Sequence, residues 1–188
     1  MQDIIRQQIQ DSISTKQEVL AKLVPSIEKT ASVLIAALKN GNKILVCGNG
    51  GSAADSQHFA AELVVRFEKE RRALPAIALT TDTSSLSAGG NDYGFDSVFA
   101  RQIDALGNKG DVLVAISTSG NSPNILKAID AAKNRGMEII GLTGRDGGKM
   151  KCLPDCIIIP SGITARIQEC HTMIIHVWCK LIDSAFAK

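Results

Sequence analysis

Short apolar runs alternate with longer stretches of mixed polarity along most of this chain. The runs are typical of buried strands, and the stretches between them show the apolar spacing of amphipathic helices. Strands are predicted at 43–47, 76–79, 111–116, 137–142 and 156–159, with helices at about 52–71, 94–106 and 123–135. Buried strands that alternate with helices favour a parallel sheet covered on both faces. The pattern therefore predicts an α/β fold, a three-layer α-β-α sandwich with a five-stranded parallel sheet.

Further helical patterns flank this alternating region. Isoleucines recur at helical spacing near the N-terminus, at Ile4, Ile5, Ile9 and Ile13. We expect that helix to end at Pro25 and a second helix to run from Ser26 to Asn40-Gly41. A long closing helix over 163–186 is apolar around most of its circumference, more than one sheet face can bury. We expect the opening and closing helices to form a subunit interface of a homo-oligomer; a helix at the centre of the core is the alternative.

Length and charge narrow the range of functions. The 188 residues suit one domain, residues 1–188, with N-terminal helices for oligomerisation in 1–40 and an α/β core in 41–188. The 21 basic and 19 acidic residues leave a formal net charge of +2, which gives no electrostatic footprint for nucleic acid or an anionic membrane. No apolar run approaches the roughly 20 residues of a membrane span, and the start lacks a signal-peptide pattern. We expect a cytoplasmic protein with a small ligand, no nucleic acid and no membrane partner.

Cysteine usage agrees with that compartment. Five cysteines are an odd number and are scattered along the chain, which favours reduced thiols over a disulfide framework. Cys152 and Cys156 are spaced like a metal-binding pair, but no second pair matches them, so a structural zinc site there is disfavoured.

Two polar loops follow predicted strands, and each begins a helix. The first loop is Gly48-Asn49-Gly50-Gly51-Ser52, and the second is Ser117-Thr118-Ser119-Gly120-Asn121-Ser122. Glycines allow the tight turns in which backbone N–H groups point at a phosphate, and a helix start adds the positive end of its dipole. Because parallel strands end at one edge of a sheet, the two loops predict one sugar-phosphate pocket.

The predicted helix after the first loop carries residues suited to acid–base chemistry. His58, Glu62 and Arg66 follow one another at i, i+4 spacing, so they should project along one stripe. An imidazole, a carboxylate and a guanidinium supply a proton acceptor, a proton donor or metal ligand, and an anion clamp. A solvated helix face with charge pairs is the alternative, and the adjacent loop favours the site.

The closing helix carries polar residues in apolar surroundings. They are Arg166, Gln168, Glu169, His171 and His176. The apolar neighbours of His176 predict that it is buried with a partner, as a satisfied core histidine or in a site. Gln168 lies two turns earlier and can reach the same pocket. With His58 and Glu62, these side chains offer a mixed nitrogen and oxygen set for a divalent metal.

Asn91 and Asp92 lie in a predicted loop rich in glycine and serine. Their amide and carboxylate groups suit hydrogen bonds to sugar hydroxyls. A plain turn explains the motif equally well.

Taken together, these motifs resemble the sugar isomerase (SIS) domain family, and within it the bacterial phosphoheptose isomerases. The matching segments are 47–52 with Asp55, 58–63, 90–92, 116–122, 142–144 with 146–148, and 166–169 with His176. The resemblance covers almost the whole chain. It implies the flavodoxin-like SIS fold and a homotetramer.

The resemblance also implies a reaction. It is the conversion of sedoheptulose 7-phosphate to D-glycero-D-manno-heptose 7-phosphate through an enediolate, the first step of ADP- or GDP-heptose biosynthesis for lipopolysaccharide core or related glycans. Glu62 matches the base that moves a proton between C1 and C2, and His176 matches the acid. The positions that match substrate-binding residues are Asn49, Gly50, Gly51, Ser52, Glu62, Arg66, Asn91, Asp92, Ser117, Thr118, Ser119, Ser122 and Gln168. Those that match a zinc site in some members are His58, Glu62, Gln168 and His176.

Other members of the domain family supply the alternatives. One is a non-catalytic SIS protein that binds the replication initiator and shares the motif 165–169; it departs from the isomerases at the positions of Glu62 and His176, which this chain keeps. Another is a different SIS sugar-phosphate isomerase or a sugar-phosphate-sensing regulator, although no DNA-binding segment is evident. Some isomerases have an aspartate where this chain has Ala165, so a mechanism that relies on that aspartate does not apply here.

Overall fold

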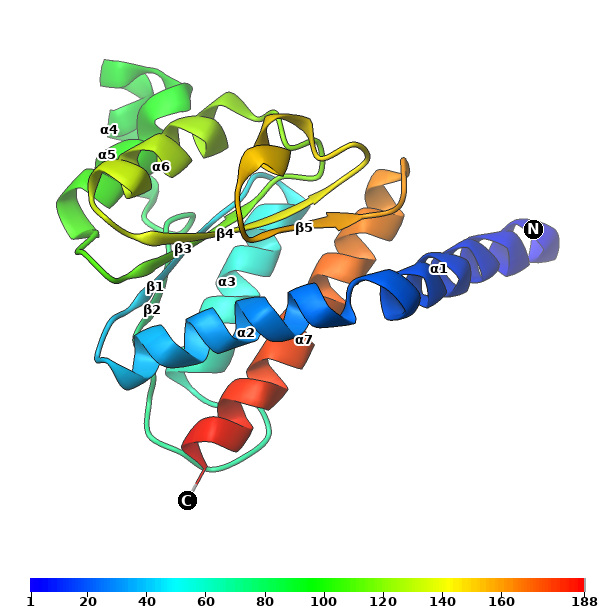
Figure 1. Cartoon of the computed structure of the whole chain (residues 1–188). Helices are drawn as coiled ribbons and strands as arrows, with labels where there is room; N and C mark the ends of the chain where they lie inside the picture. The colour runs from blue at the N-terminus through cyan, green and yellow to red at the C-terminus, as the bar shows by residue number, and fades with distance from the viewer. Residues whose placement is uncertain (188) are drawn as a thin grey trace.

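A computed structural model describes residues 1–187, and a parallel sheet of five strands lies at its centre (Figure 1). The strands are β1 (Ile44–Cys47), β2 (Ala76–Ala78), β3 (Val112–Ile116), β4 (Glu138–Gly144) and β5 (Cys156–Ile159). Neighbouring strands all run parallel, in the order β2-β1-β3-β4-β5. The chain moves outward from β1 to β2 on one side and from β3 to β5 on the other. The connections therefore diverge between β1 and β3, which is where flavodoxin-like sheets bind their ligands.

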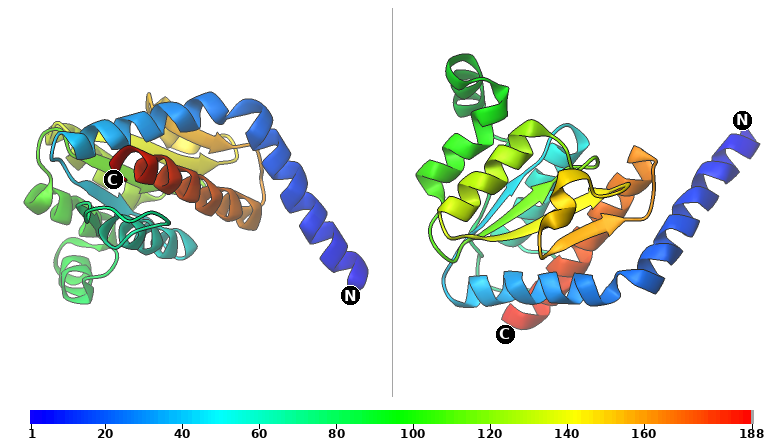
Figure 2. Two further views of the ribbon diagram at one scale, coloured as in Figure 1. Left: turned by 90° about the horizontal axis from the view of Figure 1, so that it is seen from below. Right: turned by 45° about the horizontal axis from the view of Figure 1, so that its top comes forward.

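Helices cover both faces of the sheet, which confirms the predicted three-layer sandwich (Figure 2). They are α1 (Gln2–Lys22), α2 (Val24–Lys39), α3 (Gly51–Val64), α4 (Thr83–Tyr93), α5 (Val98–Leu106), α6 (Pro123–Asn134) and α7 (Thr164–Phe186), with 3-10 turns η1 (Phe95–Ser97) and η2 (Gly148–Cys152). Alternate residues of β1 face opposite layers, because side chains alternate along a strand. Ile44 and Val46 join the core under α2, α3 and α7, whereas Leu45 and Cys47 join the core under α5 and α6.

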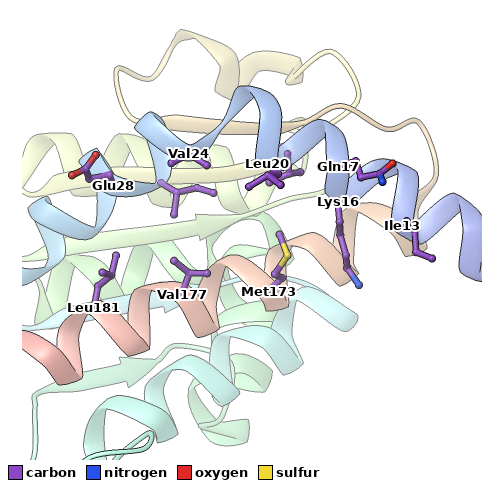
Figure 3. A pocket seen from close by; sticks show the side chains of 11 residues that line it. Ile13, Lys16, Gln17, Leu20, Val24, Glu28, Met173, Val177 and Leu181 are labelled. Carbon is purple, nitrogen blue, oxygen red and sulfur yellow. The ribbon is translucent and has the colours of Figure 1, made fainter.

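The long helix α7 contributes to the core and to the surface. It packs against α2 and α3, and fully buried Trp178 donates its indole N–H to Thr30 Oγ1 at 3.1 Å. A second stripe of α7 side chains faces a groove at the surface and not the core. Met173, Val177 and Leu181 line an apolar groove of about 790 Å³ together with residues of α1 and α2 (Figure 3).

Helix α1 extends away from the rest of the chain (Figures 1 and 2). Of its 21 residues, only Thr15 and Val19 are buried. Its isoleucine row is exposed, by 68% at Ile4, 58% at Ile5, 56% at Ile9 and 44% at Ile13. The interface of this row with a second subunit stays a prediction.

The sequence-based expectation differs most from the structure in three places. Pro25 does not end the first helix; the break lies at Leu23, and Pro25 occupies the first turn of α2, where its missing N–H costs nothing. The helix predicted to reach residue 71 ends at Val64 and is followed by an irregular connection over 65–75. The region predicted as a loop before residue 94 forms α4, capped by Asp82, whose carboxylate accepts the Ser85 N–H at 3.0 Å.

All five cysteines are free thiols, as predicted. Burial raises the pKa of Cys47, next to the first loop, to about 12, so its thiol is protonated and unreactive. In residues 1–187, no helix has both the length and the apolar character needed to cross a membrane.

Candidate active site

The loop between β1 and α3 is shaped by its glycines. A Cβ on Gly48 would lie 2.4 Å from the carbonyl oxygen of Ser52, so the close turn requires glycine. Gly50 has a φ of +55° and immediately precedes α3, and Ser52 is buried in the first turn of that helix. The loop therefore surrounds the N-terminal end of α3, where free N–H groups and the helix dipole attract an anion.

The loop between β3 and α6 brings hydroxyl groups together. Ser117 Oγ is 3.0 Å from Ser122 Oγ and 3.4 Å from Ser119 Oγ. Gly120, with a φ of +64°, makes the turn between them, and Thr118 lies half-buried in the same loop. These side chains form a compact set of donors at the start of α6.

The two loops contact each other across the boundary between β1 and β3. Asn49 Nδ2 donates to Asn124 Oδ1 at 2.9 Å, and Asn124 Nδ2 donates back to Asn49 Oδ1 at 2.8 Å. The prediction that both loops lie at one sheet edge is confirmed. Sequence reasoning missed Asn124, because an asparagine in the first turn of a helix is unremarkable until its partner is known.

Gln168 on α7 lies over the first loop. A Cβ on Gly51 would be only 2.4 Å from Gln168 Nε2, so the amide packs directly on the glycine backbone. The structure thereby places an amide donor beside the N-terminal end of α3.

Helices α3 and α7 bring three of the four predicted proton-transfer or metal-binding residues into contact. His58 Nε2 lies 3.1 Å from Glu62 Oε1 and 3.1 Å from His176 Nε2. The two imidazole rings have centroids 4.9 Å apart, and the ring of Phe67 stacks on His176 at 5.5 Å. Thus a carboxylate and two imidazoles form one partly exposed cluster along the pair of helices.

The cluster has the donor chemistry of a zinc site. The 3.1 Å separations are close to the ~3.3 Å edge of a tetrahedron of ligands about 2.0 Å from zinc. Among residues 1–187, however, no three His, Cys, Asp or Glu side chains are arranged as a ready metal site, and Gln168 packs on Gly51. The residues therefore fit zinc in donor type, and a four-ligand site of His58, Glu62, Gln168 and His176 stays a prediction.

Asp55 is a further polar residue between the loop and the cluster. It is buried one turn before His58, and Thr172 Oγ1 on α7 donates to its Oδ1 at 2.8 Å. Burial raises the pKa of Asp55, although the Thr172 hydrogen bond and the charges of His58 and His176 act in the opposite direction. The motif match includes Asp55, but nothing in the sequence pattern assigns it this contact with α7.

Arg66 does not lie on the stripe predicted for it. Because α3 ends at Val64, Arg66 belongs to the exposed connection, where its guanidinium donates to the Glu68 carbonyl at 3.3 Å and lies 3.9 Å from Glu70. The predicted common stripe therefore holds for His58 and Glu62 and is wrong for Arg66.

Asn91 and Asp92 belong to α4 and not to a loop. Both are exposed, and Asn91 Nδ2 donates to Asp92 Oδ1 at 2.8 Å. Asp92 lines a cavity together with Asp82 and Arg101, and no other predicted substrate-binding residue lines that cavity. A sugar-binding role for Asn91 and Asp92 stays a prediction.

The fully buried histidine of α7 is His171, whereas His176 is only half-buried. His171 is 0% exposed, and its Nε2 lies 3.1 Å from the carbonyl oxygen of Thr143. Its Nδ1 has no hydrogen-bond partner among residues 1–187. The expectation of a buried His176 is thus wrong, because the helix turns Ile174, Ile175 and Trp178 to the core and His176 toward α3.

Lowering the pH is expected to destabilise the fold through His171. Burial lowers the pKa of this imidazole to about 4, despite the opposing hydrogen bond with Thr143, so the folded chain takes up its proton later than the unfolded chain. Stability should therefore fall as the pH drops from about 6.5 to about 4, by on the order of 3 kcal/mol. Urea unfolding at pH 7 and pH 4.5 measures this, and His171→Gln should lose less stability over that interval. An equal loss in both proteins would contradict the assignment.

Comparison with known proteins agrees with this geometry. The SIS domain family model matches residues 8–144. The chain is 57% identical over 173 residues to the phosphoheptose isomerase of Aliarcobacter butzleri, covering 89% of this chain and 92% of that one. It is 55% identical over 187 residues to the phosphoheptose isomerase of Nitratiruptor sp., covering 99% and 100%. The solved phosphoheptose isomerase of Neisseria gonorrhoeae superposes with a TM-score of 0.91 at 50% identity, over 97% and 98% of the two chains.

The parallel sheet and the two glycine and serine loops define an SIS-domain protein. Within that class, the chain belongs to the phosphoheptose isomerase family.

Proposed function

We propose that this chain is an aldose–ketose isomerase that converts sedoheptulose 7-phosphate to D-glycero-D-manno-heptose 7-phosphate. This reaction begins ADP- or GDP-heptose biosynthesis for lipopolysaccharide core or related glycans, and we place it in the cytoplasm. The observation that carries the proposal is the contact of His58 with both Glu62 and His176, near the β1–α3 and β3–α6 loops that are suited to bind a phosphate. Family membership at 57% and 55% identity supports it.

The phosphate end of the substrate would bind at the two loops. Ser52 and the N-terminal end of α3 offer donors on one side, and the hydroxyls of Ser117, Ser119 and Ser122 offer donors on the other. Backbone N–H groups of the glycines complete an anion site that needs no basic side chain. Gln168, which packs on Gly51, would then hydrogen-bond the sugar next to the phosphate.

The proton transfer would take place at the other end of the sugar. The Glu62 carboxylate removes the proton from C1 of the open-chain ketose, and an enediolate forms as the C2 carbonyl oxygen gains negative charge. Returning that proton to C2 gives the aldose, while the His176 imidazole donates and accepts the protons on the oxygen atoms. This chemistry requires only ordinary acids and bases, because the carbonyl already acidifies the neighbouring C–H bond.

A zinc ion on His58, Glu62, Gln168 and His176 is part of the proposal. When bound, zinc would polarise the sugar carbonyl as a Lewis acid. A lone pair of Glu62 or His176 that is held by a metal is less available for proton transfer, so the metal has to share these residues with the substrate or leave. Turnover measured with zinc and after its removal distinguishes a metal that shares these residues with the substrate from one that has to leave.

We also propose that the chain acts as a homotetramer. The exposed isoleucine row of α1 and the apolar groove between α1, α2 and α7 support this, because monomers rarely leave such continuous apolar surface in water.

The decisive experiment is turnover of sedoheptulose 7-phosphate by the purified chain, with added zinc and after chelation. The aldose product is detected by the NMR signal of its anomeric proton. Product formation supports the isomerase, and comparison of the two conditions tests the metal. Absence of turnover in both conditions, with sedoheptulose 7-phosphate still bound, would instead favour the non-catalytic SIS protein that binds the replication initiator.

A further inference from the structure

A buried ion pair of Arg71 and Asp183 lies next to the cluster formed by His58, Glu62 and His176. Arg71 belongs to the irregular connection 65–75, and Asp183 belongs to the last turns of α7. Arg71 Nε donates to Asp183 Oδ1 at 2.8 Å, and the two side chains are 1% and 0% exposed. The proposed reaction leaves this pair without a role.

The guanidinium of Arg71 also closes the end of α3. It donates to the carbonyl oxygens of Glu62 at 2.7 Å, Leu63 at 2.9 Å and Arg72 at 3.0 Å. Carbonyls in the last turn of a helix have no partner within the helix, so a side chain that binds them fixes where the helix ends. One of these carbonyls belongs to the proposed catalytic base itself.

The carboxylate of Asp183 fixes the connection from the other side. Its Oδ2 accepts the backbone N–H of Glu68 at 2.7 Å and that of Lys69 at 2.8 Å. These residues directly follow Phe67, whose ring stacks on His176 with an angle of 25° between the planes. Burial alone would raise the pKa of Asp183, but the two backbone N–H groups and Arg71 hold it below its ordinary value, so the carboxylate stays charged.

A requirement for stability does not by itself explain such a pair. Removing two charges from water is costly, and apolar residues of similar volume often stabilise a fold as well or better. An ion pair with fixed partners can, however, hold the backbone around it in one arrangement. Arg71 and Asp183 together bind five backbone groups.

We propose that Arg71 and Asp183 are positioning residues, which orient Glu62 through its carbonyl group and His176 through Phe67. The inference rests on the proposed isomerase function for its effect on catalysis. Its structural part, the orientation of the His176 ring, stands apart from that function.

The test uses the full-length chain with Asp183→Asn, which keeps the size of the side chain and removes its charge. Asp111→Asn is a matched control, because Asp111 also accepts two backbone N–H groups and pairs with a basic side chain, Lys43 at 2.5 Å. That pair lies at the amino-terminal edge of the sheet, away from both loops. For each variant, kcat and KM are measured per folded enzyme, and the imidazole resonances of His176 and His58 are recorded by NMR.

In Asp183→Asn, kcat should fall roughly 10- to 100-fold with little change in KM, because a displacement of about 1 Å in a reacting group has effects of this size. The His176 resonances should move as well. Asp111→Asn should lose stability without either change. If the folded Asp183→Asn variant keeps the kcat and the His176 resonances of the control, the proposal is wrong.

Two further observations keep the test decisive. If Asp183→Asn does not fold, Phe67→Leu replaces it, since Phe67 is only partly buried and its loss should still move the His176 resonances. Unmoved resonances in Phe67→Leu would overturn the link to His176. If the wild-type chain shows no turnover, the proposed function fails, and the resonances alone decide whether the ion pair orients the ring.

Discussion

Replacing Glu62 by Gln is expected to lower kcat by about 10²- to 10⁴-fold, the usual contribution of a general base. The carboxamide has almost the same shape and keeps an oxygen that can accept a hydrogen bond from His58, 3.1 Å away in the wild type. It cannot take the proton from C1, however. KM should change little, because the phosphate is held at the two loops. Turnover of sedoheptulose 7-phosphate gives both constants, and the incorporation of deuterium from D₂O into the sugar reports the proton transfer separately.

The matched control is Glu138→Gln. Glu138 is the exposed first residue of β4, at the opposite edge of the sheet from the loops. Its replacement removes one negative charge from the chain without touching the site and should leave kcat unchanged. Deuterium incorporation at the wild-type rate in Glu62→Gln would remove Glu62 from the proton transfer and leave His176 as the remaining candidate.

The sheet could be predicted from the sequence because its buried strands give a strong pattern of apolar residues. Strand β1, predicted at 43–47, is found at Ile44–Cys47, and β3, predicted at 111–116, is found at Val112–Ile116. Both strands are buried on two faces, so each appears as an unbroken apolar run. The loops that follow them could be located for the same reason, since glycines and hydroxyls contrast sharply with an apolar strand.

The errors arose where tertiary contacts override local pattern. The residues after Val64 continue an acceptable helical pattern, but the buried pair of Arg71 and Asp183 ends α3 and directs the chain into the connection. Arg66 therefore lies in the connection and not on the helix predicted for it. Similarly, glycine and serine predict a loop around Asn91 and Asp92, whereas the Asp82 cap begins a helix that includes both residues.

The histidines of α7 illustrate the limit of periodicity. His171 and His176 are five residues apart, so they point in directions that differ by about 140° around a helix of 3.6 residues per turn. The apolar neighbours belong to His176, yet the packing of α7 against the sheet and α3 buries His171 instead. The contact of His176 with His58 depends on the spacing of two helices that are far apart in sequence, which no local pattern encodes.

Replacing Gly120 by Ala is expected to disable the second phosphate loop. The φ of +64° is unfavourable for alanine by about 1–2 kcal/mol. In addition, the new Cβ would lie 2.1 Å from the carbonyl oxygen of Gly147, a backbone atom that cannot move without shifting its own loop. Such overpacking adds about 1–3 kcal/mol. Urea unfolding should therefore show a loss of about 2–5 kcal/mol, and KM should rise because Ser117, Ser119 and Ser122 are displaced.

Gly41→Ala separates the two contributions. Gly41 lies between α2 and the start of β1, whereas both loops follow the carboxyl ends of their strands. Its φ is +81°, and a Cβ at this position would meet no atom within 4 Å. It carries the conformational cost alone, so its variant should lose only about 1–2 kcal/mol and keep the wild-type KM. If Gly120→Ala were no less stable than Gly41→Ala, the tight contact with Gly147 would not constrain the loop. If its KM were also that of Gly41→Ala, the hydroxyl cluster would not depend on this turn.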